Sequence, residues 1–442
     1  MKALLGKATA ALPPGTVAVA GGTVVLGAAS YVHLGVAGHS LSTEAMANVS
    51  VLWTIVMSVG IGVFFPVEQE LTRIVAARTV LGQGAAPVLR RATLMTAAML
   101  GATLLVLALG AGPIADLLFQ GDRGLVAALG GAFTGMAVCY LTRGVLAGLG
   151  RFGAYGLQLG LDGGLRILLA FGCAVLGLDS ALAFSLVLAL APVAAMLVTL
   201  PPLLRAAGPG GAVSWRELTG GLGLLILSTL LSQVVVNAAV MSTKLLAPTD
   251  SVLIAALLNA LVLARVPLFV FGSLQASLLG GLTAAFTAGD RAAFSAMLRR
   301  IAVVVGMLGL AGGIPATALG PWLIEVLFGA RPVLGCLDFF LLSAGTVAYM
   351  FAMVLGQALM VFKRHHLQLL CWAVGTAVLV GVTFAPGEVA LRVILAYALG
   401  SLATVLGMLA VLRLRFPGAP GATGGSGHEG AARPLGAGAV GE

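Results

Sequence analysis

Residues 251–284 read SVLIAALLNALVLARVPLFVFGSLQASLLGGLTA, and Arg265 is the only charged residue in this stretch. A helix of about 20 apolar residues crosses the hydrocarbon core of a bilayer, so we expect a membrane span here. A guanidinium near the bilayer centre costs about 2.5–3.5 kcal/mol on insertion scales, and it normally faces a water-filled cavity or an anionic partner. The stretch therefore predicts a membrane protein with a polar site for something negatively charged.

The rest of the chain has the same composition as this stretch. Of its 442 residues, 60% are hydrophobic and 9% are charged, whereas a soluble domain carries about 25% charged residues. The sequence therefore predicts an all-α polytopic membrane protein. We expect about twelve transmembrane helices, over residues 12–37, 45–66, 88–111, 124–147, 154–177, 180–204, 218–243, 251–284, 301–328, 334–361, 366–384 and 389–412.

Basic residues are distributed unevenly between the loops on the two sides. With both termini in the cytoplasm, 18 lysines and arginines fall on the inner side, Arg73 and Arg143 among them, and 3 fall in outer loops. This asymmetry follows the positive-inside rule, so we expect a multi-pass protein with both termini cytoplasmic. The net charge of +9 then reflects topology and anionic membrane lipids, not nucleic-acid binding.

The two halves resemble each other at a spacing of about 208 residues. GPIADLLFQGDR (112–123) matches GPWLIEVLFGAR (320–331), Tyr140 matches Tyr349, and Gln158 matches Gln368. A repeat of six spans gives two parallel halves with a site between them. We expect an N-terminal six-helix bundle (1–204), a cytosolic linker (205–217), a C-terminal six-helix bundle (218–415) and a disordered cytosolic tail (416–442).

Polar residues inside apolar helices are candidates for a substrate site, because burying them in a membrane is costly. Asp162 and Arg166 are four residues apart and can pair on one helix face. That pair is either purely structural or the polar lining of a cavity. The candidate substrate-binding residues are Arg265, Arg166, Asp162, Asn259, Gln233 and Asn237.

A second group of residues is a candidate for gating or ion coupling. FPVEQELTR (65–73) ends the second span, and its Glu70 and Arg73 can pair at i, i+3. The segment is either a solvated loop helix or part of an inner gate. His33 in the first span can titrate near neutral pH. The candidates for gating or coupling are Glu68, Glu70, Arg73, Arg143 and His33.

No catalytic constellation is present. The chain lacks the Walker A, HExxH and GxSxG motifs, and its four cysteines form no metal-binding spacing. We therefore expect a transporter and not an enzyme, with no cofactor and no metal site.

The six-span halves, FPVEQELTR and LTRGVLAGLGRFGAYGLQLGLDGGLR (141–166) resemble the multidrug/oligosaccharidyl-lipid/polysaccharide (MOP) exporter superfamily. The chain is similar in particular to bacterial polysaccharide-biosynthesis flippases of actinobacterial type. The resemblance implies a MATE-like, V-shaped pair of bundles in the plasma membrane that works by alternating access. It also implies a polyprenyl-pyrophosphate-linked oligosaccharide as substrate, bound through Arg265. Polysaccharide polymerase or glycosyltransferases are the implied partners.

Two other functions stay open at this stage. A cation-coupled multidrug (MATE-like) exporter of the same superfamily would favour carboxylates in its cavity, and Asp162 is the clear intramembrane carboxylate. A non-transporting scaffold in a cell-wall assembly complex could use the disordered tail as a partner contact, although the sequence offers no binding motif. For either transporter the sequence leaves the coupling ion, H⁺ or Na⁺, undecided.

Overall fold

A computed structural model describes residues 16–247, 251–264, 266–328 and 333–415 of the chain. These residues form helices joined by short loops, without a strand among them. Twelve of the helical segments are long and apolar enough to cross a membrane. The predicted all-α fold with twelve membrane helices is therefore confirmed. The expected disordered tail, 416–442, lies outside the described residues.

The first half of the chain provides six of these spans. The second span bends through a π-helical turn, because α3, η1 and α4 follow one another without a loop. This span is longer than predicted, so FPVEQELTR lies inside a helix that continues to Val80. The elements are α2 (Thr16–Ser40), α3 (Thr43–Ile55), η1 (Val56–Gly60), α4 (Ile61–Val80), α5 (Ala86–Leu109), α6 (Ala111–Leu118), α7 (Arg123–Gly148), α8 (Phe152–Val175) and α9 (Ala181–Ala207).

The second half provides the other six spans. The elements are α10 (Trp215–Thr219), α11 (Leu222–Leu246), α12 (Ser251–Ala264), α13 (Val266–Thr287), α14 (Arg291–Phe328), α15 (Cys336–Val361), α16 (His365–Thr383) and α17 (Val389–Arg415). The motif GPWLIEVLF lies within the long α14, whereas its match GPIADLLF begins in the separate short helix α6. The two halves therefore differ locally at this matched motif.

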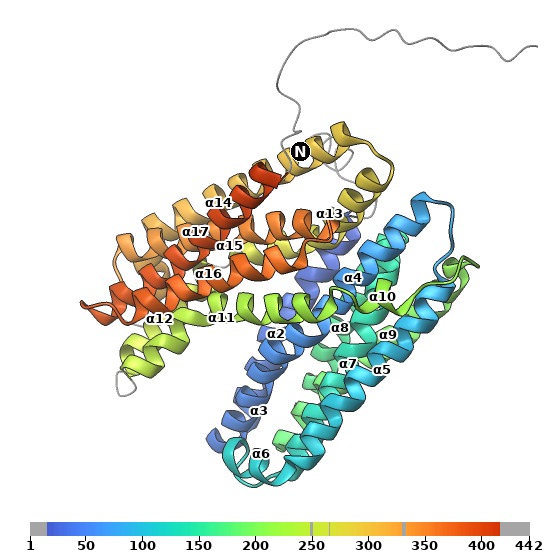
Figure 1. Cartoon of the computed structure of the whole chain (residues 1–442). Helices are drawn as coiled ribbons and strands as arrows, with labels where there is room; N and C mark the ends of the chain where they lie inside the picture. Colours follow the sequence, from blue (N-terminus) through green and yellow to red (C-terminus); the bar gives the residue numbers. More distant parts are fainter. Residues whose placement is uncertain (1–15, 248–250, 265, 329–332, 416–442) are drawn as a thin grey trace, which may run out of the picture.

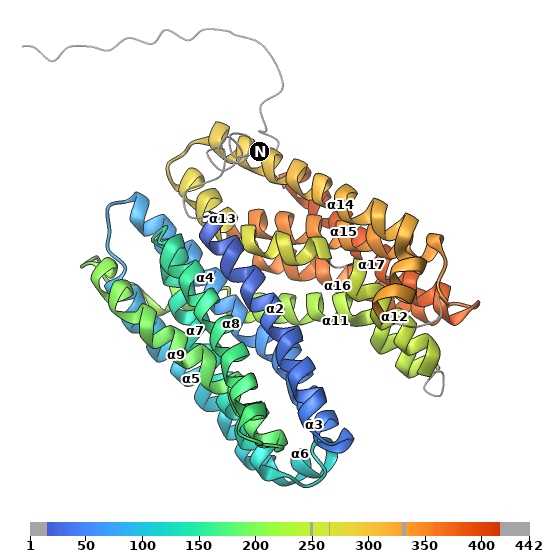
Figure 2. The same ribbon diagram turned by 180° about the vertical axis from the view of Figure 1, so that it is seen from behind.

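The two halves use the same helix packing. In the first half, α2 packs on α8, α4 on α7, and α7 on α9. In the second half, the corresponding helices pack in the same way, with α11 on α16, α13 on α15, and α15 on α17. Figures 1 and 2 show the two bundles as the arms of a V. We call these bundles the N-lobe (α2–α9) and the C-lobe (α11–α17).

The lobes touch through α4, which packs on α11 and α13, and through α2, which packs on α13. A Cβ atom placed on Gly280 of α13 would lie 3.5 Å from the Ala147 carbonyl oxygen and 3.8 Å from Thr72 Cγ2. Thr72 and Ala147 are near the ends of α4 and α7 that the loop charges assign to the cytosol. From this contact the lobes diverge toward the opposite side (Figure 1).

The connection between the lobes is fastened to the N-lobe. Arg78 of α4 donates hydrogen bonds to the carbonyl oxygens of Gly211 (2.8 Å) and Ala212 (3.1 Å). The same guanidinium forms an ion pair with Glu217 of α10 at 3.1 Å. The segment after α9 therefore has a defined path along the end of the N-lobe.

Candidate substrate pocket between the lobes

A cavity of about 360 Å³ lies between the lobes, within the range of about 300–1,000 Å³ that is typical of ligand sites. Its walls come from α2, α4, α7 and α8 of the N-lobe and from α11, α13, α15 and α16 of the C-lobe. These eight helices are four corresponding pairs in the repeat. The cavity is therefore at the interface where two parallel repeats are expected to form a site.

Matched residues of the two halves both line this pocket. Three lining pairs share a spacing of 206 residues, and a fourth pair has a spacing of 209. The pairs are Thr23 with Thr229, Phe65 with Phe271, Gln69 with Gln275, and Tyr140 with Tyr349. The internal repeat predicted from the sequence therefore extends to the lining of the pocket.

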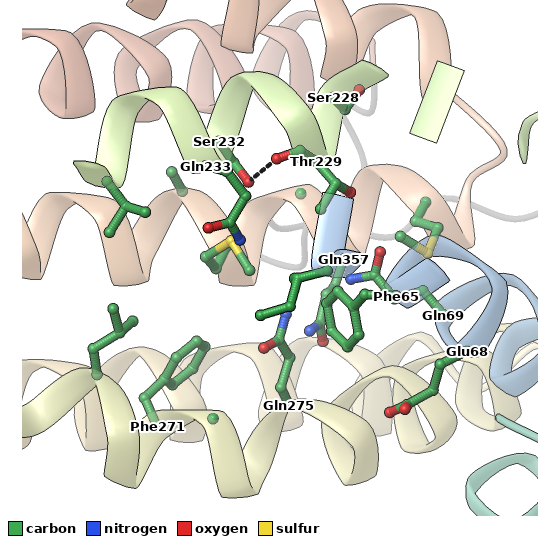
Figure 3. Close-up of a pocket in the computed structure, with 18 of the residues that line it drawn as sticks. Phe65, Glu68, Gln69, Ser228, Thr229, Ser232, Gln233, Phe271, Gln275 and Gln357 are labelled. Atoms are coloured by element: carbon green, nitrogen blue, oxygen red, sulfur yellow. Dashed lines mark hydrogen bonds between the residues drawn. The ribbon is translucent and has the colours of Figure 1, made fainter. Parts of the chain in front are cut away.

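Amide side chains dominate the polar lining. Five glutamines contribute, and Figure 3 shows Gln233 and Gln275 extending from α11 and α13 toward the space between these helices. Gln357 is 2% exposed, and neither atom of its amide group has a hydrogen-bond partner among the described residues. The other two glutamines in the lining are Gln69 and Gln368.

Among the described lining residues, the charged groups belong to the N-lobe. Glu68 and Arg143 both line the pocket and are both buried. The hydroxyl of Tyr155 donates a hydrogen bond of 2.7 Å to Glu68 Oε1. The guanidinium of Arg143 lies over the ring of Tyr140, 4.9 Å from its centroid, as in a cation–π contact.

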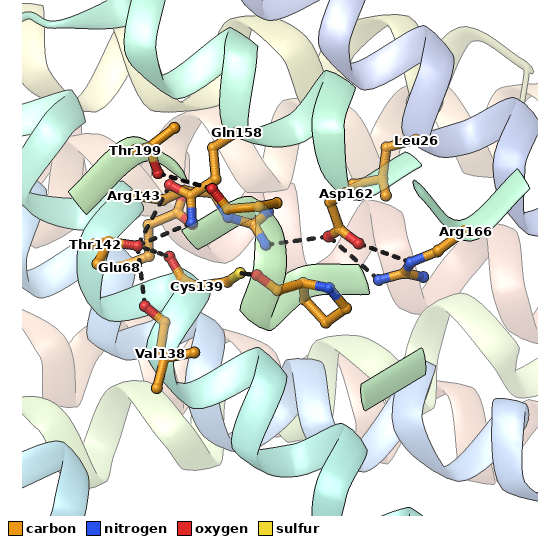
Figure 4. A network of polar contacts seen from close by, with 12 residues as sticks. Leu26, Glu68, Val138, Cys139, Thr142, Arg143, Gln158, Asp162, Arg166 and Thr199 are labelled. Atoms are coloured by element: carbon orange, nitrogen blue, oxygen red, sulfur yellow. Dashed lines mark hydrogen bonds and ion pairs between the residues drawn. The ribbon is translucent and has the colours of Figure 1, made fainter. Parts of the chain in front are cut away.

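Behind this wall, Asp162 is shared by two arginines (Figure 4). Arg166 Nε donates to Asp162 Oδ1 at 2.8 Å, and Arg166 Nη2 donates to Oδ2 at 3.3 Å. Arg143 Nη2 lies 3.8 Å from the same Oδ2. The i, i+4 pair predicted from the sequence therefore forms, and it connects to the pocket through Arg143.

Some other candidate residues lie away from the pocket lining. Glu70 and Arg73 form the predicted i, i+3 ion pair, with Arg73 Nε 2.9 Å from Glu70 Oε2. Both side chains are buried rather than solvated. His33 is fully buried against Phe184. Asn237 donates a hydrogen bond of 2.9 Å to the backbone oxygen of Gln233 on its own helix.

Arg265, the residue that first indicated an anion site, lies outside the described residues, and so does the side chain of Asn259. A different arginine occupies the described lining. Counting Arg143 as a loop charge was wrong, because this residue lies inside α7, within the predicted span 124–147, and is buried beside the pocket. Counting Arg73 as a loop charge was also wrong, since α4 continues to Val80.

Sequence reasoning missed Gln69, Gln357 and Tyr155 as lining residues. Burying a glutamine in a membrane helix costs free energy, so each glutamine in an apolar segment was a usable signal. Their common role is visible only in the folded chain, where five of them line one pocket. The described residues contain no group of three or more potential metal ligands.

Comparisons with solved structures identify the fold. No protein-family model matches the sequence, and no curated protein matches it. Among solved structures, a mutant of the Vibrio cholerae MATE transporter VcmN superposes with a TM-score of 0.77 at 15% identity, covering 90% of this chain and 96% of that one. The chain has the MATE transporter fold.

Two further structures with the MATE fold show the same likeness. A MOP superfamily transporter from Pyrococcus furiosus, whose binding pocket is described as having reverse polarity that suggests a different function, matches with a TM-score of 0.74 at 16% identity. The match covers 90% of this chain and 94% of that one. A multidrug resistance MATE family transporter in an outward-facing conformation matches with a TM-score of 0.71 at 16% identity, covering 91% and 95%.

Proposed function

We propose that this protein is a flippase that moves a polyprenyl-pyrophosphate-linked oligosaccharide from the cytoplasmic to the outer leaflet by alternating access. The observation that carries the proposal is the chemistry of the pocket between the lobes. Its described lining offers a guanidinium, Arg143, and five amides, while the lining carboxylate, Glu68, already accepts a hydrogen bond from Tyr155.

A guanidinium suits the pyrophosphate group for a geometric reason. Its planar fork stays charged and can donate two parallel hydrogen bonds to phosphate oxygens. Arg143 Nε has no hydrogen-bond partner among the described residues. Arg265, predicted to lie in the eighth span, would supply a second cation. Together they would hold a dianionic group that the bilayer alone excludes.

The arrangement of the lobes supports a rocking movement. They touch near Thr72 and Gly280 and diverge toward the other side, so a site between them can open to each side in turn. In this mechanism the polar head group crosses through the pocket while the polyprenyl chain remains in the bilayer.

A cation-coupled multidrug exporter is the second candidate, and the MATE fold supports it equally. The observation in its favour is Glu68, because Oε2 of this pocket carboxylate has no hydrogen-bond partner among the described residues. Such a group could bind an organic cation between Phe65 and Phe271, or carry the coupling H⁺ or Na⁺. The two candidates differ in whether Arg143 helps or hinders the substrate.

The deciding experiment is transbilayer movement of a fluorescent polyprenyl-pyrophosphate oligosaccharide in proteoliposomes. We expect flipping by the wild type, and at least about tenfold slower flipping by Arg143→Gln and by Arg265→Ala, since a charged hydrogen bond contributes about 1.5–3 kcal/mol. Arg216→Ala, at an exposed arginine of α10, is the control. Absence of flipping with several glycans, together with proton-driven export of ethidium that Glu68→Gln abolishes, would instead establish the exporter.

A further inference from the structure

The N-lobe and C-lobe walls of the pocket carry chemically different residues at positions that the repeat matches. At the spacing of 206 residues, Glu68 of the N-lobe corresponds to Leu274 of the C-lobe. At the spacing of 209 residues that relates the two tyrosines, Arg143 corresponds to Ala352. The C-lobe therefore replaces both charged positions by apolar residues. Among the described lining residues, it contributes four of the five glutamines instead.

Three of these C-lobe amides have unused hydrogen-bonding atoms. Gln357 is 2% exposed and Gln368 is 8% exposed. Within the described part of the chain, both amide atoms of Gln357, Oε1 of Gln368 and Nε2 of Gln275 lack a partner. A buried polar group without a partner costs about 1–3 kcal/mol. A cluster of such groups around one cavity is available to bind water or the hydroxyl groups of a ligand.

The N-lobe contains a glutamine that matches Gln368 in the repeat and can be compared with it. Gln158 of α8 matches Gln368 of α16, and it is fully buried but does not line the pocket. Its Nε2 donates to Thr142 Oγ1 at 2.9 Å, and its Oε1 accepts from the same hydroxyl at 3.3 Å. This matched glutamine, which lies away from the cavity, therefore has its hydrogen bonds within the fold. Unused amide atoms occur where the side chain faces the cavity.

We propose that the C-lobe wall, defined by Gln275, Gln357 and Gln368, binds an uncharged sugar ring of the substrate. This inference rests on the proposed flippase function. It assigns the pyrophosphate to the arginines proposed above and the adjoining sugar to the glutamines of the C-lobe wall, opposite Arg143. An amide carries both donors and an acceptor, as does a sugar hydroxyl. An amide has no net charge, so these glutamines suit an uncharged group that both donates and accepts hydrogen bonds.

Aromatic rings beside the amides complete the chemistry of a sugar site. Phe271, Tyr349 and Trp372 of the C-lobe also line the pocket, and the rings of Tyr349 and Trp372 lie 5.6 Å apart. A pyranose ring has an apolar face of C–H groups as well as its hydroxyl edge. Aromatic rings can cover that face while the glutamines bind the edge.

The test measures binding of p-nitrophenyl glycosides of neutral hexoses to the purified full-length protein by tryptophan fluorescence and by calorimetry. We expect wild-type binding in the millimolar range or tighter, and about tenfold weaker binding by the double variant Gln357→Met/Gln368→Met, because two hydrogen-bonding groups are lost. Gln158→Met is the repeat-matched control and should bind the glycosides like the wild type. It should also be the less stable variant, because it removes a satisfied hydrogen bond.

Each result either supports or overturns the inference. Equal affinities of the wild type and the double variant would overturn it, as would no binding of any neutral glycoside by the wild type. The flipping assay runs in parallel with the same variants. If the wild type and the double variant flip at the same rate and with the same glycan preference, the flippase function stands and the sugar site is wrong. If the wild type does not flip the lipid-linked substrate, the function itself fails.

Discussion

Replacing Asp162 by asparagine should destabilise the protein by about 3–5 kcal/mol. The carboxylate is 1% exposed and compensates two buried guanidiniums, of Arg166 at 2.8 Å and of Arg143 at 3.8 Å. Asparagine keeps the size of the side chain but removes its negative charge. Breaking a buried ion pair by removing one partner costs about 3–5 kcal/mol, because the other charge stays buried without compensation. This loss is a large fraction of the stability of a typical protein, about 5–15 kcal/mol.

The measurement is reversible unfolding by SDS in mixed micelles, which gives the free energy of unfolding of each variant. Arg166→Met should also be costly, since it leaves Asp162 with the more distant Arg143. The double variant Asp162→Asn/Arg166→Met should lose less than the sum of the two single changes, because residues in one ion-pair network couple by about 0.5–3 kcal/mol. Asp179→Asn, in the exposed loop before α9, is the control and should be neutral.

A loss below about 1 kcal/mol for Asp162→Asn, the level of an exposed ion pair, would refute this reasoning. Strict additivity of the two single changes would refute it as well, because it would show that Asp162 and Arg166 do not stabilise each other.

Two further predictions concern helix packing and lobe movement. Gly156→Ala should cost about 1–3 kcal/mol, since its Cβ would lie 2.3 Å from the backbone oxygen of Ala18 on α2, whereas Gly164→Ala, with nothing within 4 Å, should leave the SDS midpoint unchanged or raise it. Cysteines at Thr72 and Gly280 should form a disulfide under oxidation and stop transport until a reductant is added, because the Gly280 Cβ position lies 3.8 Å from Thr72 Cγ2. Transport that continues at full rate in the cross-linked protein would contradict alternating access through separation of this contact.

The twelve spans and the repeat could be predicted because both depend on local sequence. A span needs about 20 apolar residues in a row, and the pair of Asp162 and Arg166 needs only the helical spacing of four residues. The hydrogen bond from Tyr155 to Glu68 joins residues of two different helices. Its formation depends on how α4 and α8 pack, which no single-helix pattern encodes.

The central pocket shows the same limit. Arg143 was assigned to a loop because basic residues near span ends usually lie there, but α7 packs on α4 and brings this arginine to the pocket. Gln357 stands alone in its helix without any polar partner at helical spacing. Its role becomes visible only when the repeat is folded and Gln275 and Gln368 converge on the same cavity.

The geometry of the N-lobe network bears on how an anion could enter without breaking it. Asp162 lies between Arg166 and Arg143, so one buried carboxylate faces two guanidiniums. Arg166 holds Asp162 with two hydrogen bonds, whereas Arg143 approaches the same carboxylate only to 3.8 Å. An incoming phosphate group can therefore take Arg143 while Asp162 keeps its stronger partner, which avoids the penalty for an unpaired buried carboxylate. Because Arg166 keeps Asp162 paired, Arg143 is available to bind a substrate. The buried pair of Asp162 and Arg166 therefore affects the pocket although neither residue lines it.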